Sequence, residues 1–155
     1  MKIVRSLLLS MLMSFAFIVP AAFAGEPPAP APQQSATLYQ RLGGYDALAA
    51  VTDDFLGQLA TDPQLGRFFI GLSTDSKVKV RQHVVDFLCA ATGGPCKYTG
   101  RDMKTAHTGL NITAQDWNSS VKYLVGTLDK FKVPEKEKNE VLAAISGLKG
   151  DIVGR

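Results

Sequence analysis

The sequence predicts an all-α protein with one domain. Over residues 37–155, apolar residues recur three and four positions apart, which is the spacing of helix faces that pack against a core. The alternation of apolar and polar residues that is typical of strands is weak. Glycine pairs and a Gly-Pro sequence divide the chain into helix-length segments. These residues are enough for a single hydrophobic core, and no internal repeat is evident.

The N-terminal residues have the features of an export signal. Lys2 and Arg5 lie at the start of an apolar run over residues 7–19, and Ala22-Phe23-Ala24 fits a signal-peptidase site. We therefore interpret residues 1–24 as a signal peptide, with an uncleaved anchor as the alternative. The mature protein is expected to be periplasmic or secreted after cleavage near Ala24.

Residues 25–36 (GEPPAPAPQQSA) are rich in proline and alanine, which predicts a disordered or extended tether.

The charge balance of the mature chain excludes several classes of partner. Loss of Lys2 and Arg5 with the signal peptide would leave the basic residues, 17 in the full chain, almost balanced by the 14 acidic ones. Such a chain has no electrostatic footprint for nucleic acid or for a strongly anionic membrane. No cysteine directly follows the cleavage site to carry a lipid, so we expect no stable membrane anchor.

The first helical segments are marked by glycine and by capping residues. A short turn over residues 38–42 ends at Gly43-Gly44, and residues 45–60 form the next helix. Asp62 then fits an N-cap, followed by a proline at the first position of a short helix that runs through Phe68-Phe69. The residues expected to face inward from the 45–60 helix are Leu48, Val51, Phe55, Leu56 and Leu59.

A long helix is predicted over residues 74–92, because Gly93-Gly94-Pro95 ends it firmly. His83 lies on or near the inner face of this helix. The residues expected to form that face are Val80, Val84, Phe87, Leu88 and Ala91. Residues 96–102 look irregular, and residues 103–107 could form about one helical turn.

Two long helices complete the domain. Thr113-Ala114-Gln115-Asp116 resembles a capping box and starts a helix that extends to about Phe131. Its inward residues are Trp117, Val121, Leu124, Val125 and Leu128. Pro134 starts the last helix. The inward residues of that helix are Val141, Leu142, Ile145, Leu148 and Ile152.

The two cysteines, Cys89 and Cys96, are compatible with a disulfide in an exported chain. On one continuous helix they would lie about 10.5 Å apart along the axis, which is too far to bridge. The Gly93-Gly94-Pro95 break allows the chain to turn back, so we favour a Cys89–Cys96 disulfide. The alternative is a pair of reduced thiols, one of them buried.

The two histidines, His83 and His107, lie on either side of the Gly-Pro break. A histidine at the end of a short helical turn can donate Nδ1–H to a backbone carbonyl and leave Nε2 free to bind a metal. The alternative is an ordinary histidine that is partly buried, bonds a carbonyl and has no further role. A closed zinc site needs four ligands, and no Cys-x-x-Cys or His-x-x-x-His spacing is present. Haem needs only one or two axial protein ligands, because the porphyrin supplies four nitrogens. Without a Cys-x-x-Cys-His motif, such a haem would be held non-covalently.

Several motifs along residues 37–153 share the pattern of one family. They are Leu38-Tyr39-x-Arg41-Leu42-Gly43-Gly44, Asp53-Asp54-Phe55, Asp62-x-x-Leu65-x-x-Phe68-Phe69, Gly93-Gly94-Pro95-x-x-Tyr98-Thr99-Gly100-Arg101-x-Met103-x-x-x-His107 and Gly109-Leu110-x-Ile112-Thr113. In these motifs the chain resembles the truncated haemoglobins of group I. The resemblance implies a two-over-two helical sandwich around haem b, with His107 as the proximal iron ligand. It also implies that Phe69 packs on the haem face and that Met103, Tyr98 and Trp117 line the pocket or its rim.

The distal side departs from that family's pattern. Leu56 stands where the family usually has a tyrosine that donates a hydrogen bond to dioxygen, Val84 stands where it often has glutamine, and Val80 is apolar as well. Loss of that hydrogen bond costs on the order of 1–3 kcal/mol, so we expect dioxygen to be held weakly. His83 matches a position where some cyanobacterial and algal relatives carry a histidine that binds iron. Here it could be a sixth ligand, a distal hydrogen-bond donor or a solvent-facing residue.

The function that these observations predict is that of a haem protein that binds diatomic gases (O2, NO or CO), with a role in NO or O2 chemistry or in redox reactions. Activity as an NO dioxygenase or a peroxidase would need an external reductant, and so a redox partner protein, because no flavin or nicotinamide motif occurs in the sequence. A haem-free helical interaction module is the alternative. If His83 does bind iron, the oxidation state of Cys89 and Cys96 is expected to shift that binding.

Overall fold

The computed structural model describes residues 35–155, which belong to a compact unit of residues 34–155. The predicted signal peptide, residues 1–24, and nearly all of the predicted tether lie outside the described residues. No helix among residues 35–155 is both long enough and apolar enough to cross a membrane.

The described part of the chain is helical and contains no strand, which confirms the predicted fold class. Its elements are α1 (Leu38–Arg41), α2 (Gly44–Thr61), the 3₁₀-helix η1 (Gly66–Phe69), α3 (Thr74–Ala91), α4 (Met103–His107), α5 (Ala114–Lys130), α6 (Glu135–Ser146) and α7 (Lys149–Ile152). The predicted bounds of α4, α3 and α5 are met to within a residue.

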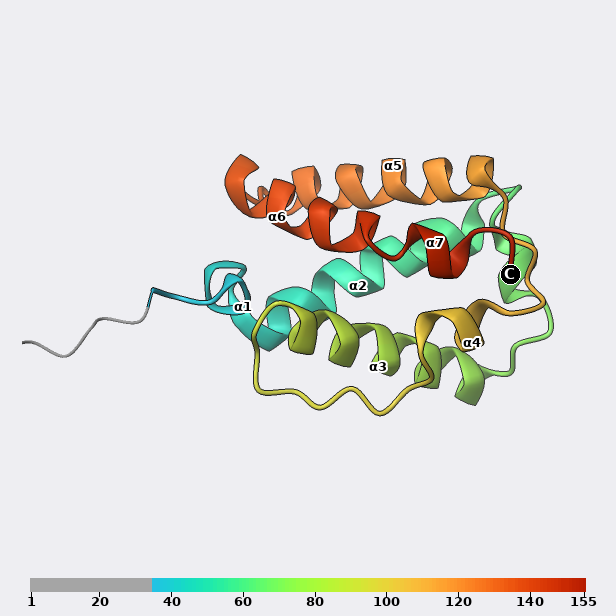
Figure 1. The fold of residues 1–155 in the computed structure, drawn as a ribbon, viewed down its shortest axis with the longest axis horizontal. Coiled ribbons are helices and arrows are strands. Elements are labelled where there is room, and N and C mark those ends of the chain that lie inside the picture. Colours follow the sequence, from blue (N-terminus) through green and yellow to red (C-terminus); the bar gives the residue numbers. More distant parts are fainter. Residues whose placement is uncertain (1–34) are drawn as a thin grey trace, which may run out of the picture. The chain divides into compact units, whose positions relative to one another are not determined.

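The helices form two pairs, as the expected two-over-two arrangement requires. Helix α2 packs against α3, and α5 packs against α6 (Figure 1). Helix α2 also contacts α1, η1 and α5, so it joins the two pairs. The core lies at this junction. Its buried members Val51, Leu124, Leu128 and Val141 come from α2, α5 and α6.

Capping residues place the helix starts where the sequence predicts them. Thr113 accepts a hydrogen bond from the backbone of Asp116 while the Asp116 side chain bonds back to Thr113, which completes the predicted capping box of α5. Thr37 forms a second capping box with Gln40 at α1. Gly43 and Gly44 have φ values of +96° and +79°, a conformation that side chains other than glycine rarely adopt.

Three local expectations are corrected by the structure. The last helix is not continuous, since α6 ends before Gly147 and α7 starts at Lys149. Glycine is a poor helix former. The amide of Leu148 instead donates a hydrogen bond to the carbonyl oxygen of Ile145 in a tight turn. The predicted helix after Asp62 is largely a turn, with only η1 in 3₁₀ form. Asp62 still caps this segment, since its Oδ1 accepts hydrogen bonds from the amides of Gln64 and Leu65.

The third correction concerns the buried face of α3. The fully buried residues are Val85 and Cys89, each 0 % exposed, whereas Val80, Val84 and Phe87 are half-buried and Ala91 is exposed. On the same side of α3 as Val85, Arg81 forms an ion pair with Asp53 of α2. Helical spacing alone could not indicate this stripe, because α3 carries apolar residues on two sides.

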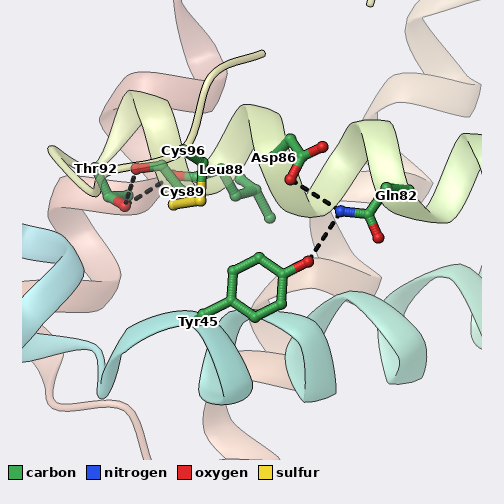
Figure 2. The surroundings of a disulfide bond; sticks show 7 residues. All are labelled: Tyr45, Gln82, Asp86, Leu88, Cys89, Thr92 and Cys96. Carbon is green, nitrogen blue, oxygen red and sulfur yellow. Dashed lines mark hydrogen bonds between the residues drawn. A yellow bond between two sulfur atoms is a disulfide. The ribbon is translucent and has the colours of Figure 1, made fainter. Parts of the chain in front are cut away.

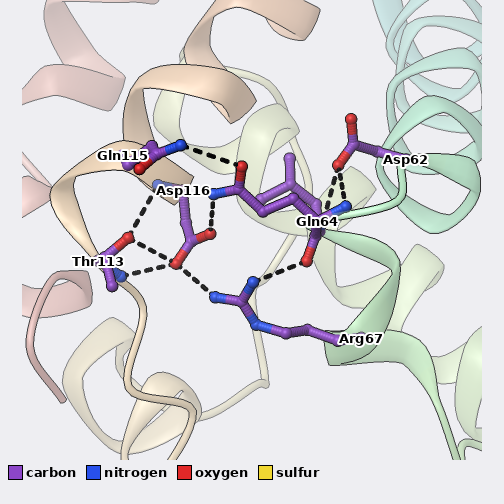
Figure 3. A network of polar contacts seen from close by, with 7 residues as sticks. Asp62, Gln64, Arg67, Thr113, Gln115 and Asp116 are labelled. Atoms are coloured by element: carbon purple, nitrogen blue, oxygen red, sulfur yellow. Dashed lines mark hydrogen bonds and ion pairs between the residues drawn. The ribbon is translucent and has the colours of Figure 1, made fainter.

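A buried carboxylate joins η1 to the start of α5 (Figure 3). Asp116 is 1 % exposed, and its Oδ1 accepts a hydrogen bond of 2.6 Å from Gln64 Nε2. Its Oδ2 accepts bonds from Arg67 Nη2 at 2.7 Å and from the amide and hydroxyl of Thr113 at 2.9 and 2.8 Å. Burial by itself would raise the pKa of Asp116, but these donors and the charge of Arg67 outweigh it and lower the pKa to about 2.

We expect the Asp116→Asn substitution to lower the free energy of unfolding at pH 7 by on the order of 2 kcal/mol. The hydrogen-bond donors around residue 116 would then face an uncharged amide and not a carboxylate. A carboxylate whose pKa is lowered on folding stabilises the protein above its unfolded pKa of about 4, and this stabilisation is lost as the pH falls toward 2. Urea denaturation at pH 7, 4 and 2.5 should therefore show a smaller loss of stability on acidification in the variant. Asn118→Ala, at an exposed position of α5 outside this network, is the control. An identical pH dependence in Asp116→Asn and wild type would contradict the assignment.

Candidate functional site

The short helix α4 fixes the orientation of His107. Asp102 caps it, since its Oδ1 and Oδ2 accept bonds of 2.9 and 2.7 Å from the amide and hydroxyl of Thr105. His107 is half-buried at the last position of the helix, and its Nδ1 lies 2.7 Å from the carbonyl oxygen of Met103. With the proton on Nδ1, this is the carbonyl contact that the sequence led us to expect. Among residues 35–155, Nε2 has no hydrogen-bond partner and is free to bind a ligand.

The C-terminal residues hold α4 in place. Helix α4 packs against α7 (Figure 1). The segment that follows α4 is bonded to the end of the chain, because Asn111 N donates to Arg155 O at 2.7 Å and Gly154 N donates to Ile112 O at 2.9 Å. The position of His107 therefore depends on residues more than forty positions further along the chain, which no local sequence pattern indicates.

Helix α3 has a second apolar side that the protein leaves partly uncovered. Successive residues of a helix are about 100° apart, so Val80, Val84 and Phe87 lie on the side roughly opposite to the buried pair Val85 and Cys89. We call these three half-buried residues the open face of α3. Part of this side borders a small apolar cavity of about 40 Å³ between α3 and α6. The cavity is lined by Phe87, Leu88, Ala91, Thr92, Val141, Ala144 and Ile145.

Tyr98 packs against the edge of this face. Its ring centroid lies 5.4 Å from that of Phe87 and 6.1 Å from that of His83, in each case with the planes at 79°. Its hydroxyl donates a hydrogen bond of 2.5 Å to the carbonyl oxygen of Arg101. Burial, and secondarily the charge of Asp102, raise the pKa of Tyr98. His83 is exposed beside it.

The other predicted site residues are distributed over four elements. Leu56 on α2, Phe69 on η1 and Met103 on α4 are half-buried, and Trp117 at the start of α5 is buried. Their roles as pocket residues remain predictions, as do those of Val80 and Val84.

Two polar residues near α3 had no signal in the sequence. The Tyr45 hydroxyl accepts a bond of 2.9 Å from Gln82 Nε2, which also donates to Asp86 Oδ1 at 2.9 Å (Figure 2). The Thr52 hydroxyl is fully buried, lies one helical turn before Leu56 and has no partner among the described residues. Both features depend on the packing of α2, and the spacing within one helix could not reveal them.

The Cys89–Cys96 disulfide is present, as the sequence favoured (Figure 2). The Cα atoms of the two cysteines are 5.7 Å apart, and Cys89 is 0 % exposed. Gly94 allows the chain to reverse here: a Cβ atom at this position would lie 2.6 Å from Cδ2 of Tyr39 and 2.7 Å from Sγ of Cys89. The bridge therefore fastens residue 96 to the end of α3, two residues before Tyr98.

Reduction of this disulfide by a dithiol should lower the free energy of unfolding by about 2.5 kcal/mol, because the unfolded chain regains the freedom of a short loop. Urea denaturation of oxidised and reduced protein measures the difference. The Cys96→Ala variant is the control, since a dithiol should not change its stability further. Equal denaturation midpoints for oxidised and reduced wild type would show that the bridge does not constrain the unfolded chain.

Comparisons with known proteins agree with this geometry. The family described as bacterial-like globin matches residues 37–153. The chain is 36 % identical over 119 residues to "Group 1 truncated hemoglobin GlbN" of Mycolicibacterium paratuberculosis, covering 77 % of this chain and 85 % of that protein. It is 34 % identical over 119 residues to the protein of the same name from Nostoc commune, covering 77 % and 98 %.

Solved structures show the same fold. The truncated hemoglobin of Tetrahymena pyriformis in its Fe(III) form is 29 % identical and superposes with a TM-score of 0.70, over 77 % of this chain and 100 % of that one. The 2/2 hemoglobin of Synechococcus sp. PCC 7002, in the cyanomet state and with covalently attached heme, is 28 % identical with a TM-score of 0.70 and the same coverage.

These matches cover the whole helical domain, and they lend no support to a haem-free interaction module. The chain therefore belongs to the bacterial-like globins, as a group 1 truncated haemoglobin with the two-over-two helical fold, in a family of haem proteins that bind diatomic gases.

Proposed function

We propose that the domain binds haem b non-covalently through His107 as proximal ligand, and that it binds a diatomic gas on the side of α3. The hydrogen bond between His107 Nδ1 and Met103 O carries this proposal, because it orients the imidazole and leaves Nε2 as the coordinating atom. Haem supplies an iron with four porphyrin nitrogens and an open position for a gas.

The residues present fit such a cofactor. The half-buried open face of α3 offers an apolar surface that the protein does not cover. The apolar cavity between α3 and α6 holds only about 40 Å³, far less than the roughly 300–1,000 Å³ of ligand pockets, so a porphyrin would lie mostly along the open face. Among residues 35–155, no group of three or more His, Cys, Asp or Glu side chains that could hold a metal ion is present.

The pairing of the two cysteines supports non-covalent attachment. Both cysteines of the chain form the disulfide, so neither thiol is free to bond a haem vinyl group. The Synechococcus relative carries covalently attached heme. The present chain has two histidines, and the proposal assigns both of them to the iron, His107 as the proximal ligand and His83 as an exchangeable one.

The side chains proposed for the distal side are apolar and would offer a bound gas no hydrogen bond. Leu56, Val80 and Val84 are apolar and half-buried. Dioxygen gains most from a donor beside the iron, and its absence costs on the order of 1–3 kcal/mol, whereas CO and NO need such a donor least. We therefore propose CO or NO as better-retained ligands than O2.

His83 is the remaining imidazole, and we propose it as an exchangeable sixth ligand. It is on α3 next to Val84, and its exposure allows the ring to change rotamer once the edge contact with Tyr98 is broken. A gas must then wait for His83 to leave, which favours a role in redox reactions or NO chemistry over oxygen carriage. Turnover would require an electron from a partner protein, because the sequence has no flavin or nicotinamide motif. Residues 1–24 support a periplasmic or secreted location.

The His107→Gly variant should lose most of its haem affinity, because no other side chain is assigned to the proximal side. Titration of the purified protein with haem, followed by the Soret absorbance, measures the affinity. His83→Ala is the matched control and should still take up haem. Equal uptake by His107→Gly and wild type would exclude His107 as the proximal ligand.

The His83→Ala variant should lose any low-spin, six-coordinate spectrum and should bind CO faster, because no internal ligand competes. The visible bands of the ferric and ferrous forms and stopped-flow mixing with CO are the measurements. A low-spin spectrum that survives in His83→Ala would mean that another group is the sixth ligand.

A further inference from the structure

We propose that Tyr98 is a positioning residue for His83: its ring holds the imidazole at the edge of the open face of α3, away from the iron, and the Cys89–Cys96 disulfide keeps Tyr98 in place. The inference rests on the proposed role of His83 as an exchangeable sixth ligand.

The contact between the two rings is direct. His83 and Phe87 are four residues apart on α3 and so lie on one side of the helix. The Tyr98 ring meets both of them edge to face, with centroid distances of 6.1 Å to His83 and 5.4 Å to Phe87. Pairs of this geometry stabilise the arrangement beyond the apolar area that they bury. Phe87 thus fixes the ring of Tyr98 against α3, and that ring in turn contacts His83.

Contacts with neighbouring residues of its own segment also hold Tyr98 in place. Its hydroxyl donates to the carbonyl oxygen of Arg101, and the ring folds closely over Gly100, where a Cβ atom would lie 2.3 Å from the tyrosine oxygen. Two residues before Tyr98, the disulfide joins Cys96 to Cys89, which is fully buried on α3. The disulfide therefore fastens the start of this segment to α3, and the hydroxyl bond to Arg101 folds the segment around the ring of Tyr98.

The direction of the effect follows from where His83 lies on the helix. Given 100° per residue, His83 is about 60° around the axis from Val80 and about 100° from Val84, on the side of Tyr98. The imidazole is exposed in this conformer. The ring contact therefore stabilises an orientation in which His83 is directed to the edge and not across the open face. Because a contact made in only one of two conformers shifts their ratio, loss of the contact should increase the share of iron-bound His83.

The test compares haem-loaded wild type with the variants Tyr98→Leu, Tyr98→Phe and Cys96→Ala. Tyr98→Leu keeps an apolar side chain but removes the ring, and we expect the ratio of His83-bound to His83-free iron to rise about three- to tenfold. CO association, limited by the His83-free form, should slow accordingly. Cys96→Ala should change both quantities in the same direction. Tyr98→Phe keeps the ring but loses the hydroxyl bond to Arg101, so its effect should be smaller than that of Tyr98→Leu, within about twofold of wild type.

A second measurement needs no haem. In the haem-free protein, the Tyr98 ring should shift the proton NMR signals of the His83 imidazole by its ring current. This shift should disappear in Tyr98→Leu, weaken in Cys96→Ala and persist in Tyr98→Phe. Phe131→Leu, which changes an exposed aromatic residue at the end of α5, is the control and should alter neither measurement.

The outcomes separate this inference from the proposed function. If His83→Ala abolishes the low-spin spectrum while Tyr98→Leu changes neither the His83-bound fraction nor the NMR shift, the positioning role is refuted and the ligand role stands. A lower His83-bound fraction in Tyr98→Leu would also overturn the inference, because Tyr98 would then direct His83 toward the iron. If His83→Ala leaves the spectrum unchanged, the ligand role fails, and the inference that rests on it fails with it.

Discussion

The candidate site depends on one hydrogen bond, between Nδ1 of His107 and the carbonyl oxygen of Met103, 2.7 Å apart. This bond selects the tautomer and the ring orientation that leave Nε2 available. It exists because α4 is a short helix, capped by Asp102 and packed against α7. The bonds from Asn111 to Arg155 and from Gly154 to Ile112 then tie this part of the chain to its C-terminus. The orientation of the His107 imidazole therefore depends on α4 itself and on the C-terminal residues that hold α4 in place.

Helix α3 serves two purposes because it is apolar on two sides. Val85 and Cys89 complete the packing against α2, whereas Val80, Val84 and Phe87 remain half-buried. An apolar side that the protein does not cover is costly in water, and a flat apolar cofactor would remove that cost. The disulfide adds a constraint of another kind, since it fastens the irregular segment before α4 to the end of α3. The two histidines are thus held by elements that are joined covalently as well as by packing.

The distal side chains and His83 favour the same chemistry. In the proposed function, Leu56, Val80 and Val84 would give a bound gas no hydrogen bond, and the imidazole of His83 would compete with it. Both features would act against stable oxygen carriage and would favour electron transfer or reaction with NO. The ring of Tyr98, in contact with His83, is placed to set the balance between gas binding and internal ligation.

The sequence by itself determined the fold class, most helix boundaries and the capping box at Thr113, and it favoured the disulfide and a carbonyl contact for His107. These features are local: helical spacing, capping residues and a Gly-Gly-Pro break act over a few residues, so their physics can be read from neighbouring positions. The tertiary structure decided that Val85 and Cys89 form the buried stripe of α3, that Gly147 interrupts the last helix and that Asp116 accepts hydrogen bonds from Arg67 of η1 and from Gln64 in the turn before it. It also decided that Tyr98 meets His83. Each of these depends on which helix lies opposite, because a helix with apolar residues on two sides does not itself specify which side its neighbour will cover.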